Sequence, residues 1–184
     1  MNQLTINFVV SKLKADFFTG GIYCILKHAD GLVRRGHSVN IISSPGSEKP
    51  QWIDCGANII CPPAKKKIVK YLEKSLLGKA RYKSAELKHA FTDLSAAEHI
   101  PESDITIATL WETVPTVFKY GTGARGYFMQ HFEPVFAQKG SLDEILAQHS
   151  YLYPLHKITN SSWLKSVIED FVALNGIQEN IYYG

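Results

Sequence analysis

Short runs of apolar, β-branched residues alternate along the chain with longer segments in which apolar residues recur at helical spacing. The first run, residues 6–10, predicts a buried strand. Apolar positions between Ile22 and Val33 recur every three or four residues and predict a helix, which cations and then Gly36 should end. Residues 38–43 predict the next strand. A strand, a helix and a strand in so short a segment predict a βαβ unit and hence a parallel sheet.

The same alternation continues to the end of the chain. Ser141, with Glu144 three residues later, predicts a capping box, and Ser162 is expected to cap the last helix. The predicted class is therefore α/β, with a Rossmann-like, doubly wound, largely parallel sheet and helices on both faces, in one domain over residues 1–184. Further strands are predicted over 58–61, 104–109, 127–130 and 157–160, and helices over 65–99 (interrupted near Gly78), 112–120, 141–152 and 162–175.

Composition excludes some classes of function but does not indicate one. The chain has 184 residues and a net charge of +3, too small to indicate a nucleic-acid partner. Its three cysteines, Cys24, Cys55 and Cys61, form no C-x-x-C pair and favour buried, inert thiols in a reducing compartment. Residues 6–10 are too short for a signal peptide, and no apolar run is long enough to cross a membrane, so a soluble, cytoplasmic chain is expected.

Thr19, Gly20 and Gly21 lie between the first predicted strand and its helix. Ligands of doubly wound sheets bind beyond the carboxyl ends of the strands, and free N–H groups at a helix start attract phosphate. Two glycines would let the backbone approach such a ligand closely. These three residues are therefore candidate phosphate-binding residues; a plain tight turn is the alternative interpretation.

A second glycine-rich segment, residues 121–126, matches the G-x-G-x-x-G pattern of dinucleotide sites, but it follows a helix and precedes a strand. The pattern requires the opposite order, so a helix-to-strand turn is predicted. The loop at Gly20 lacks the third glycine, and Asn40, rather than an acid, is expected to end the second strand. A nicotinamide-binding oxidoreductase is therefore a minor alternative.

Polar and aromatic residues follow two later strands at the same predicted edge of the sheet. Trp111 and Glu112 follow the strand over 104–109, and Gln130, His131 and Glu133 follow the strand over 127–130. His131, Glu133 and Glu112 are the candidate catalytic residues, while Trp111 and Gln130 are candidates for binding an acceptor substrate. Structural or capping roles and surface ion pairs are the alternatives. No metal-ligand cluster or Asp-x-Asp motif is present, so neither a metal nor a cofactor is expected.

Residues 65–88 are strongly basic, with apolar positions from Ile68 to Leu77 on one predicted helical face. Such a stripe suits peripheral contact with an anionic membrane surface or with a lipid-linked substrate. A solvated outer helix face gives the same pattern.

Five segments of the sequence together resemble a glycosyltransferase. They are the segments around Gly20 and around Gly36-His37, and residues 104–113, 127–134 and 158–164. The resemblance is to the N-terminal domain of retaining enzymes with the two-domain GT-B fold, family 4, and most closely to a rhamnosyltransferase-like branch. It extends over nearly the whole chain, with the Phe132-Glu133-Pro134 segment its most specific part. Many relatives of this branch carry Asp at the position of His131.

The resemblance implies that the chain is an acceptor-binding domain in surface polysaccharide assembly. It places Gly20 and Gly21 at the diphosphate of a nucleotide-sugar donor, and His131 near the transferred sugar. The partners implied are that donor and a glycan or lipid-linked acceptor, with no metal required. Residues 180–184 resemble the start of a linker to a second, donor-binding domain that this chain lacks. A lone domain should turn over poorly, so a split-enzyme or non-catalytic subunit that supplies acceptor or membrane contacts is the main alternative.

Overall fold

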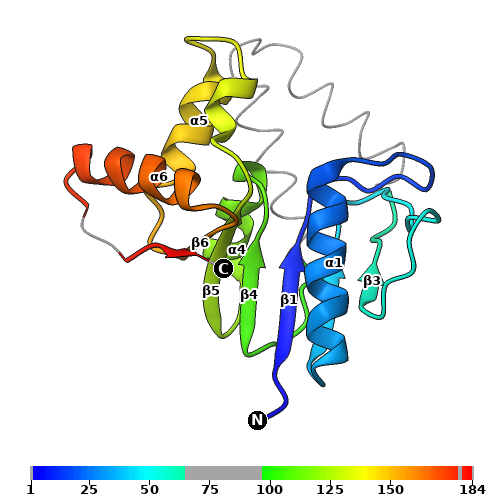
Figure 1. Ribbon diagram of the computed structural model, residues 1–184. Helices are drawn as coiled ribbons and strands as arrows, with labels where there is room; N and C mark the ends of the chain where they lie inside the picture. Colours follow the sequence, from blue (N-terminus) through cyan, green and yellow to red (C-terminus); the bar gives the residue numbers. More distant parts are fainter. Residues whose placement is uncertain (1, 65–96, 178–179, 184) are drawn as a thin grey trace.

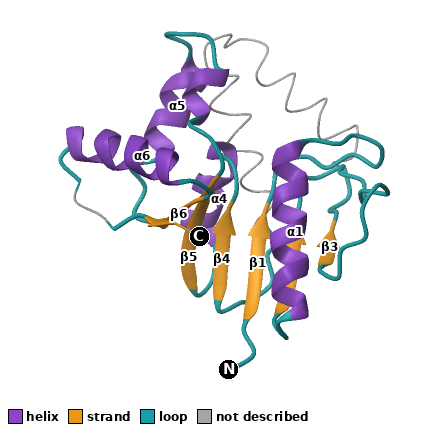
Figure 2. Ribbon diagram, viewed as in Figure 1, coloured by secondary structure: helices purple, strands orange, loops and turns teal. Residues whose placement is uncertain are grey.

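The computed structural model describes residues 2–64, 97–177 and 180–183, and their core is one parallel sheet. The seven strands lie in the order β3-β2-β1-β4-β5-β6-β7, and every neighbouring pair is parallel. Figure 2 shows the central strands β1 and β4 side by side and pointing the same way. This order is that of a Rossmann-like sheet extended by one strand. The strands are β1 (Thr5–Val9), β2 (Ser38–Ile42), β3 (Asn58–Ile60), β4 (Ile105–Ala108), β5 (Ala124–Met129), β6 (His156–Thr159) and β7 (Tyr182–Tyr183).

Helices connect these strands and cover both faces of the sheet, and Figure 1 shows α1 in front of the sheet, next to β1. The predicted α/β class and doubly wound arrangement are thereby confirmed. The predicted helix over 65–99 and the basic segment 65–88 lie almost wholly outside the described residues. The described helices are α1 (Gly20–Arg34), α4 (Val114–Tyr120), α5 (Leu142–Ser150) and α6 (Ser162–Leu174), with the 3₁₀ turns η1 (Trp111–Thr113) and η2 (Glu133–Phe136).

Successive residues of β1 supply two different cores because strand side chains alternate between the faces of a sheet. Phe8 packs with Ile25, Leu26 and Ala29 of α1 on one face. Val9 packs on the other face with residues of α4 and α6, such as Ile168. The carboxyl end of β1 is therefore fixed from both sides, which gives the loop before α1 a rigid base.

Capping residues define where the helices begin and end, and one of the two predicted caps was misplaced. The Thr19 hydroxyl accepts from the Ile22 N–H, and Gly36 ends α1 with φ of +91°. Ser161, not Ser162, caps α6, because its hydroxyl accepts from the Leu164 N–H. Ser141 caps α5 as predicted, but the Glu144 carboxylate accepts from the Gly140 N–H and not from Ser141, so the box is shifted by one residue.

Several predicted boundaries also move. Strand β5 begins at Ala124, three residues before the predicted strand, because Gly123 already turns the chain with φ of +63°. Residues 121–126 thus form a helix-to-strand turn that runs into β5, as predicted. Asn40 lies in the middle of β2 and does not end it. Two residues of the predicted linker, Tyr182 and Tyr183, form β7 beside β6.

The three cysteines are free thiols and only half-buried, not fully buried as expected. Burial nevertheless raises the pKa of the Cys24 and Cys55 thiols, which disfavours their reactive thiolate forms. Among the described residues, no helix is both long and apolar enough to cross a membrane.

Candidate functional site

The candidate site residues lie in three loops at one edge of the sheet. Strands β1, β4 and β5 are neighbours and parallel, so the loops that follow them leave the sheet at the same edge (Figure 1). These loops carry Gly20 and Gly21, then Trp111 and Glu112, and then residues 130–133. The predicted convergence of these loops at one edge is therefore present.

The N-terminus of α1 offers unpaired backbone donors at this edge. The Thr19 hydroxyl and carbonyl accept from Ile22 and Tyr23, whereas the N–H groups of Gly20 and Gly21 have no hydrogen-bond partner among the described residues. The first turn contains no acidic residue, so the helix itself supplies no carboxylate to neutralise the positive end of its dipole. This geometry suits an anion.

The backbone conformation of α1 does not itself require these two glycines. Neither has a positive φ, and a Cβ atom on Gly20 would meet nothing within 4 Å. A Cβ atom on Gly21 would lie 3.8 Å from both amide atoms of Gln130, an ordinary van der Waals contact. The first two residues of α1 therefore lack side chains because they are glycines, although the structure has room for a Cβ atom at both. Gln130 lies directly beside Gly21.

Glu133 lies beneath the rim and connects two of its loops. Its side chain is buried, with 5% of the residue exposed. Its Oε2 atom accepts from the Trp111 backbone N–H at 2.7 Å and from the Tyr127 hydroxyl at 2.9 Å. The carboxylate thus ties the start of η1 to β5, and this position favours a positioning role over contact with substrate.

Burial sets the ionisation of this cluster. Desolvation, with a smaller contribution from the nearby Glu112 charge, raises the pKa of Glu133 to about 7, although its two hydrogen bonds oppose the shift. Burial and then the Glu133 charge raise the pKa of Tyr127 and of Tyr151 well above the usual value for tyrosine. Both phenols therefore stay protonated and remain hydrogen-bond donors.

Tyr151, at the end of α5, fixes the loop after β5 from a second direction. Its hydroxyl accepts from the Glu133 N–H at 2.8 Å and donates to the His131 carbonyl at 3.4 Å. Neither Tyr127 nor Tyr151 was among the predicted site residues. The single signal in the sequence was their position within apolar segments, which indicates core residues and not anchors of a loop.

The predicted catalytic residues are not brought together as one constellation. His131 is exposed, and its ring lies 4.6 Å from the ring of Phe136 and 6.2 Å from that of Trp163, measured between centroids. Glu112 is also exposed on η1, and Glu133 is buried below it. His131 and Glu112 are accessible to a substrate, whereas Glu133 acts on the loops around them.

Two threonines that were not predicted hold the carboxyl ends of β1 and β4 together. The Thr109 hydroxyl donates to the Val9 carbonyl at 2.9 Å. The Thr113 hydroxyl accepts from the Thr109 N–H at 3.0 Å and donates to the Leu110 carbonyl. The turn into η1 is therefore fixed by side chains at the point where the rim begins.

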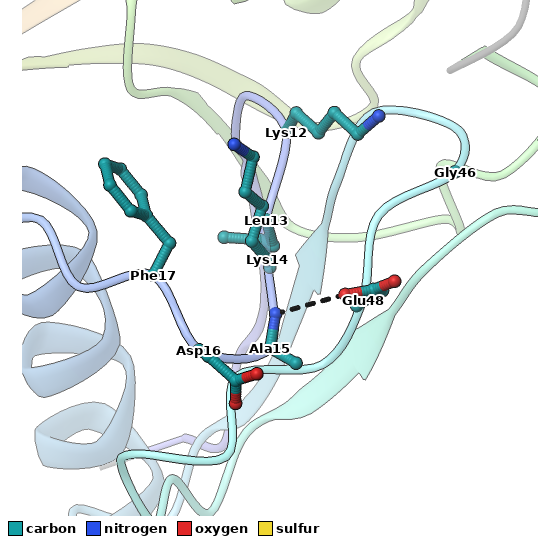
Figure 3. Close-up of a pocket in the computed structure, with 8 residues that line it drawn as sticks. All are labelled: Lys12, Leu13, Lys14, Ala15, Asp16, Phe17, Gly46 and Glu48. Atoms are coloured by element: carbon teal, nitrogen blue, oxygen red, sulfur yellow. Dashed lines mark hydrogen bonds between the residues drawn. The ribbon is translucent and has the colours of Figure 1, made fainter.

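A hollow of about 390 Å³ opens next to this rim, between the loops after β1 and β2 (Figure 3). The Leu13 N–H donates to the Ser47 hydroxyl, and the Ala15 N–H donates to the Glu48 carboxylate at 3.4 Å. Lys12 and Lys14 lie at one end of the hollow and Asp16 at the other. Its lining is mostly polar and charged, which suits a hydrophilic ligand and not a drug-like apolar one.

Within the described residues, no group of three or more histidine, cysteine, aspartate or glutamate side chains is arranged to hold a metal ion. The candidate site is thus built from backbone amides, one amide side chain, an exposed histidine and carboxylates.

No family model matches the chain. Over 162 aligned residues it is 28% identical to the O-antigen biosynthesis protein RfbC of Myxococcus xanthus. The chain is similar to a polysaccharide-assembly protein. The alignment includes 86% of this chain but 11% of the relative, so the chain spans about a tenth of that protein's length.

Proposed function

We propose that this chain is the acceptor-binding, N-terminal domain of a retaining glycosyltransferase of the GT-B type, family 4, acting in surface polysaccharide assembly. The observation that carries the proposal is the bare N-terminus of α1 at the same edge as Gln130, His131 and Trp111. The similarity to an O-antigen biosynthesis protein supports the substrate class.

In this proposal the donor diphosphate lies against the first turn of α1. The Gly20 and Gly21 N–H groups, together with the helix dipole, stabilise the negative charge that develops on the departing diphosphate. A side chain at Gly21 would project toward Gln130 and into that approach. The glycines thus act through the space they leave open, with no metal ion in the step.

The acceptor hydroxyl is held from the loops after β4 and β5. Gln130 can donate and accept a hydrogen bond, and the exposed imidazole of His131 lies at the same rim. Holding the hydroxyl against the sugar converts an encounter between two molecules into a reaction within one complex. Glu133, Tyr127 and Tyr151 keep these loops in place from below.

The proposal is tested by calorimetric titration of the chain with uridine, guanosine and thymidine diphosphate sugars, and with NADH as the rival ligand. We expect weak, saturable binding of at least one nucleotide sugar and at least a ten-fold loss of affinity in Gly21→Val. Gly31→Ala, in the last turn of the same helix, should bind like the unmodified chain. Saturable binding of NADH at micromolar concentration, with none of the sugars, would overturn the assignment.

A further inference from the structure

Three exposed aromatic side chains gather on the loop between β1 and α1 and on the first turn of that helix. Phe17, Phe18 and Tyr23 are 59%, 58% and 41% exposed. Large apolar groups gathered on a surface in this way mark a contact with another molecule or with a membrane.

The aromatic rings are interleaved with lysines. Lys14 Nζ lies 5.1 Å from the centroid of the Phe17 ring, and Lys27 Nζ lies 5.8 Å from that of Tyr23. Lys12 is a third exposed cation, at the edge of the hollow beside Lys14 (Figure 3). We refer to Lys12, Lys14, Phe17, Phe18, Tyr23 and Lys27 together as the aromatic-lysine face.

Phe18 is held in its exposed position by neighbouring rings. Its ring centroid lies 5.1 Å from that of the half-buried Trp52, in an edge-on contact, and 5.7 Å from that of Tyr23. A supported, exposed phenyl ring can enter an apolar phase without first breaking a core contact. The nearby acids oppose the lysines only in part, because Asp16 lies at the far end of the hollow and Glu48 accepts from the Ala15 N–H.

We propose that the aromatic-lysine face docks on an anionic lipid bilayer. Aromatic side chains insert at the boundary between headgroups and acyl chains, while lysines beside them meet the negative surface potential. The combination fits a bilayer better than a protein partner because cations and exposed rings alternate along the loop before α1 and the first two turns of that helix. Docking would hold Gly20, one residue beyond the loop, at the membrane surface. The proposal does not depend on transferase activity.

The test is co-sedimentation with vesicles of phosphatidylcholine alone and of phosphatidylcholine with 30% phosphatidylglycerol. We expect binding to the anionic vesicles that weakens at high salt, and little binding to the neutral ones. Replacing both Lys12 and Lys14 by Gln should weaken binding roughly thirty-fold, since each cation near such a surface contributes about a five-fold factor. Phe17→Ser with Phe18→Ser should weaken it at least about ten-fold.

Two matched controls distinguish binding through the aromatic-lysine face from a general effect of net charge or of exposed apolar surface. Lys139→Gln with Lys165→Gln makes the same change in net charge elsewhere, and Phe136→Ser removes from η2 a ring that is even more exposed than Phe17 and Phe18. Both should bind like the unmodified chain. Circular dichroism should show all variants folded, since every replaced side chain is exposed or only partly buried.

The fluorescence of Trp52 reports whether the aromatic-lysine face lies at the bilayer. In a chain with Trp111→Phe and Trp163→Phe, brominated acyl chains in the anionic vesicles should quench Trp52 fluorescence, because docking brings the indole, 5.1 Å from the Phe18 ring, close to the acyl chains. The proposal is overturned if the chain does not bind anionic vesicles. It is also overturned if replacing Lys65, Lys66 and Lys67 abolishes vesicle binding while the Lys12 and Lys14 variant binds normally.

Discussion

Glu133 shows how one buried carboxyl can hold a site together at a cost to stability. It accepts from the Trp111 N–H and the Tyr127 hydroxyl, yet its charged form is disfavoured by burial. Its folded-state pKa of about 7 lies above the ordinary value of 4.5, so the folded protein binds this proton more tightly than the unfolded chain. The stability due to that proton is complete below pH 4.5 and is lost as the pH rises through 7.

Replacing Glu133 by Gln should keep both hydrogen bonds, because the amide oxygen can accept them, and should remove the buried charge. We expect the free energy of unfolding at pH 8 to rise by up to about 3 kcal/mol, with little change at pH 4.5. Denaturant unfolding at the two pH values measures this. Glu98→Gln, at an exposed site, should change the free energy of unfolding at neither pH. If Glu133→Gln were less stable than the unmodified chain at pH 8, the buried Glu133 charge would not be destabilising, which would contradict this account.

Gly21 allows stability and binding to be separated at one residue. Gly21→Ala should stabilise α1 by up to about 1 kcal/mol, because alanine favours helix and the added Cβ has room beside Gln130. The same variant should bind a nucleotide sugar more weakly. Gly31→Ala should give a similar rise in melting temperature with unchanged binding. Equal binding by both variants would make Gly20 and Gly21 a plain helix start.

At the scale of elements, the turn from α4 into β5 depends on glycine, most strictly at position 123. At Gly123 φ is +63°, and a Cβ atom there would lie 2.1 Å from the Asp104 carbonyl oxygen. Gly123→Ala should therefore destabilise the fold by about 3 kcal/mol or more. Gly176→Ala, with φ of +75° but open space around it, should cost about 1 kcal/mol. Thermal unfolding compares them, and equal losses would contradict the steric account.

Three asparagines fix the register of β1, β2 and β3. The Asn7 amide donates to the Pro101 carbonyl at 2.7 Å, and Asn40 and Asn58 continue the series, each donating to the previous side-chain oxygen. Asn7 is fully buried, whereas Asn58 is exposed at the outer end. A ladder of this kind pairs only in one alignment of the strands.

Asn7→Leu should remove the inner rung and leave the Pro101 carbonyl and the Asn40 amide without partners. We expect a loss of about 2 to 4 kcal/mol in the free energy of unfolding. Asn58→Ala should cost less than about 1 kcal/mol because water can replace its partner. Chemical denaturation measures both, and a mild Asn7→Leu effect would show that apolar packing alone sets the register.

At the scale of the whole molecule, apolar runs were sufficient to predict six of the seven strands of the sheet. Apolar runs and the glycine at position 36 predicted β1, α1 and β2, because each local signal matches the burial that the sheet imposes. Boundaries moved where tertiary contacts decide, as at Ala124 and at β7, which pairs only because β6 lies beside it.

The sequence predicted where the candidate site lies, but not which role each of its residues has. Parallel strands deliver their loops to one edge, so Gly21 and Gln130 were expected there, and they are neighbours. The burial of Glu133 depends on Tyr127 in β5 and on Tyr151 at the end of α5, and local sequence patterns do not predict contacts between separate elements. Position along a strand predicts the edge, but only the packed structure shows which carboxyl faces solvent.

The most direct test of the central claim, that the first turn of α1 binds a diphosphate, is an amide NMR titration of the chain with inorganic pyrophosphate. This probe carries the diphosphate chemistry whatever the base or the sugar. The account predicts that the largest shifts occur at Gly20, Gly21 and Ile22, and that Gly21→Val abolishes them. Equal or larger shifts at Leu142 and Ser162, in the first turns of α5 and α6, would contradict it.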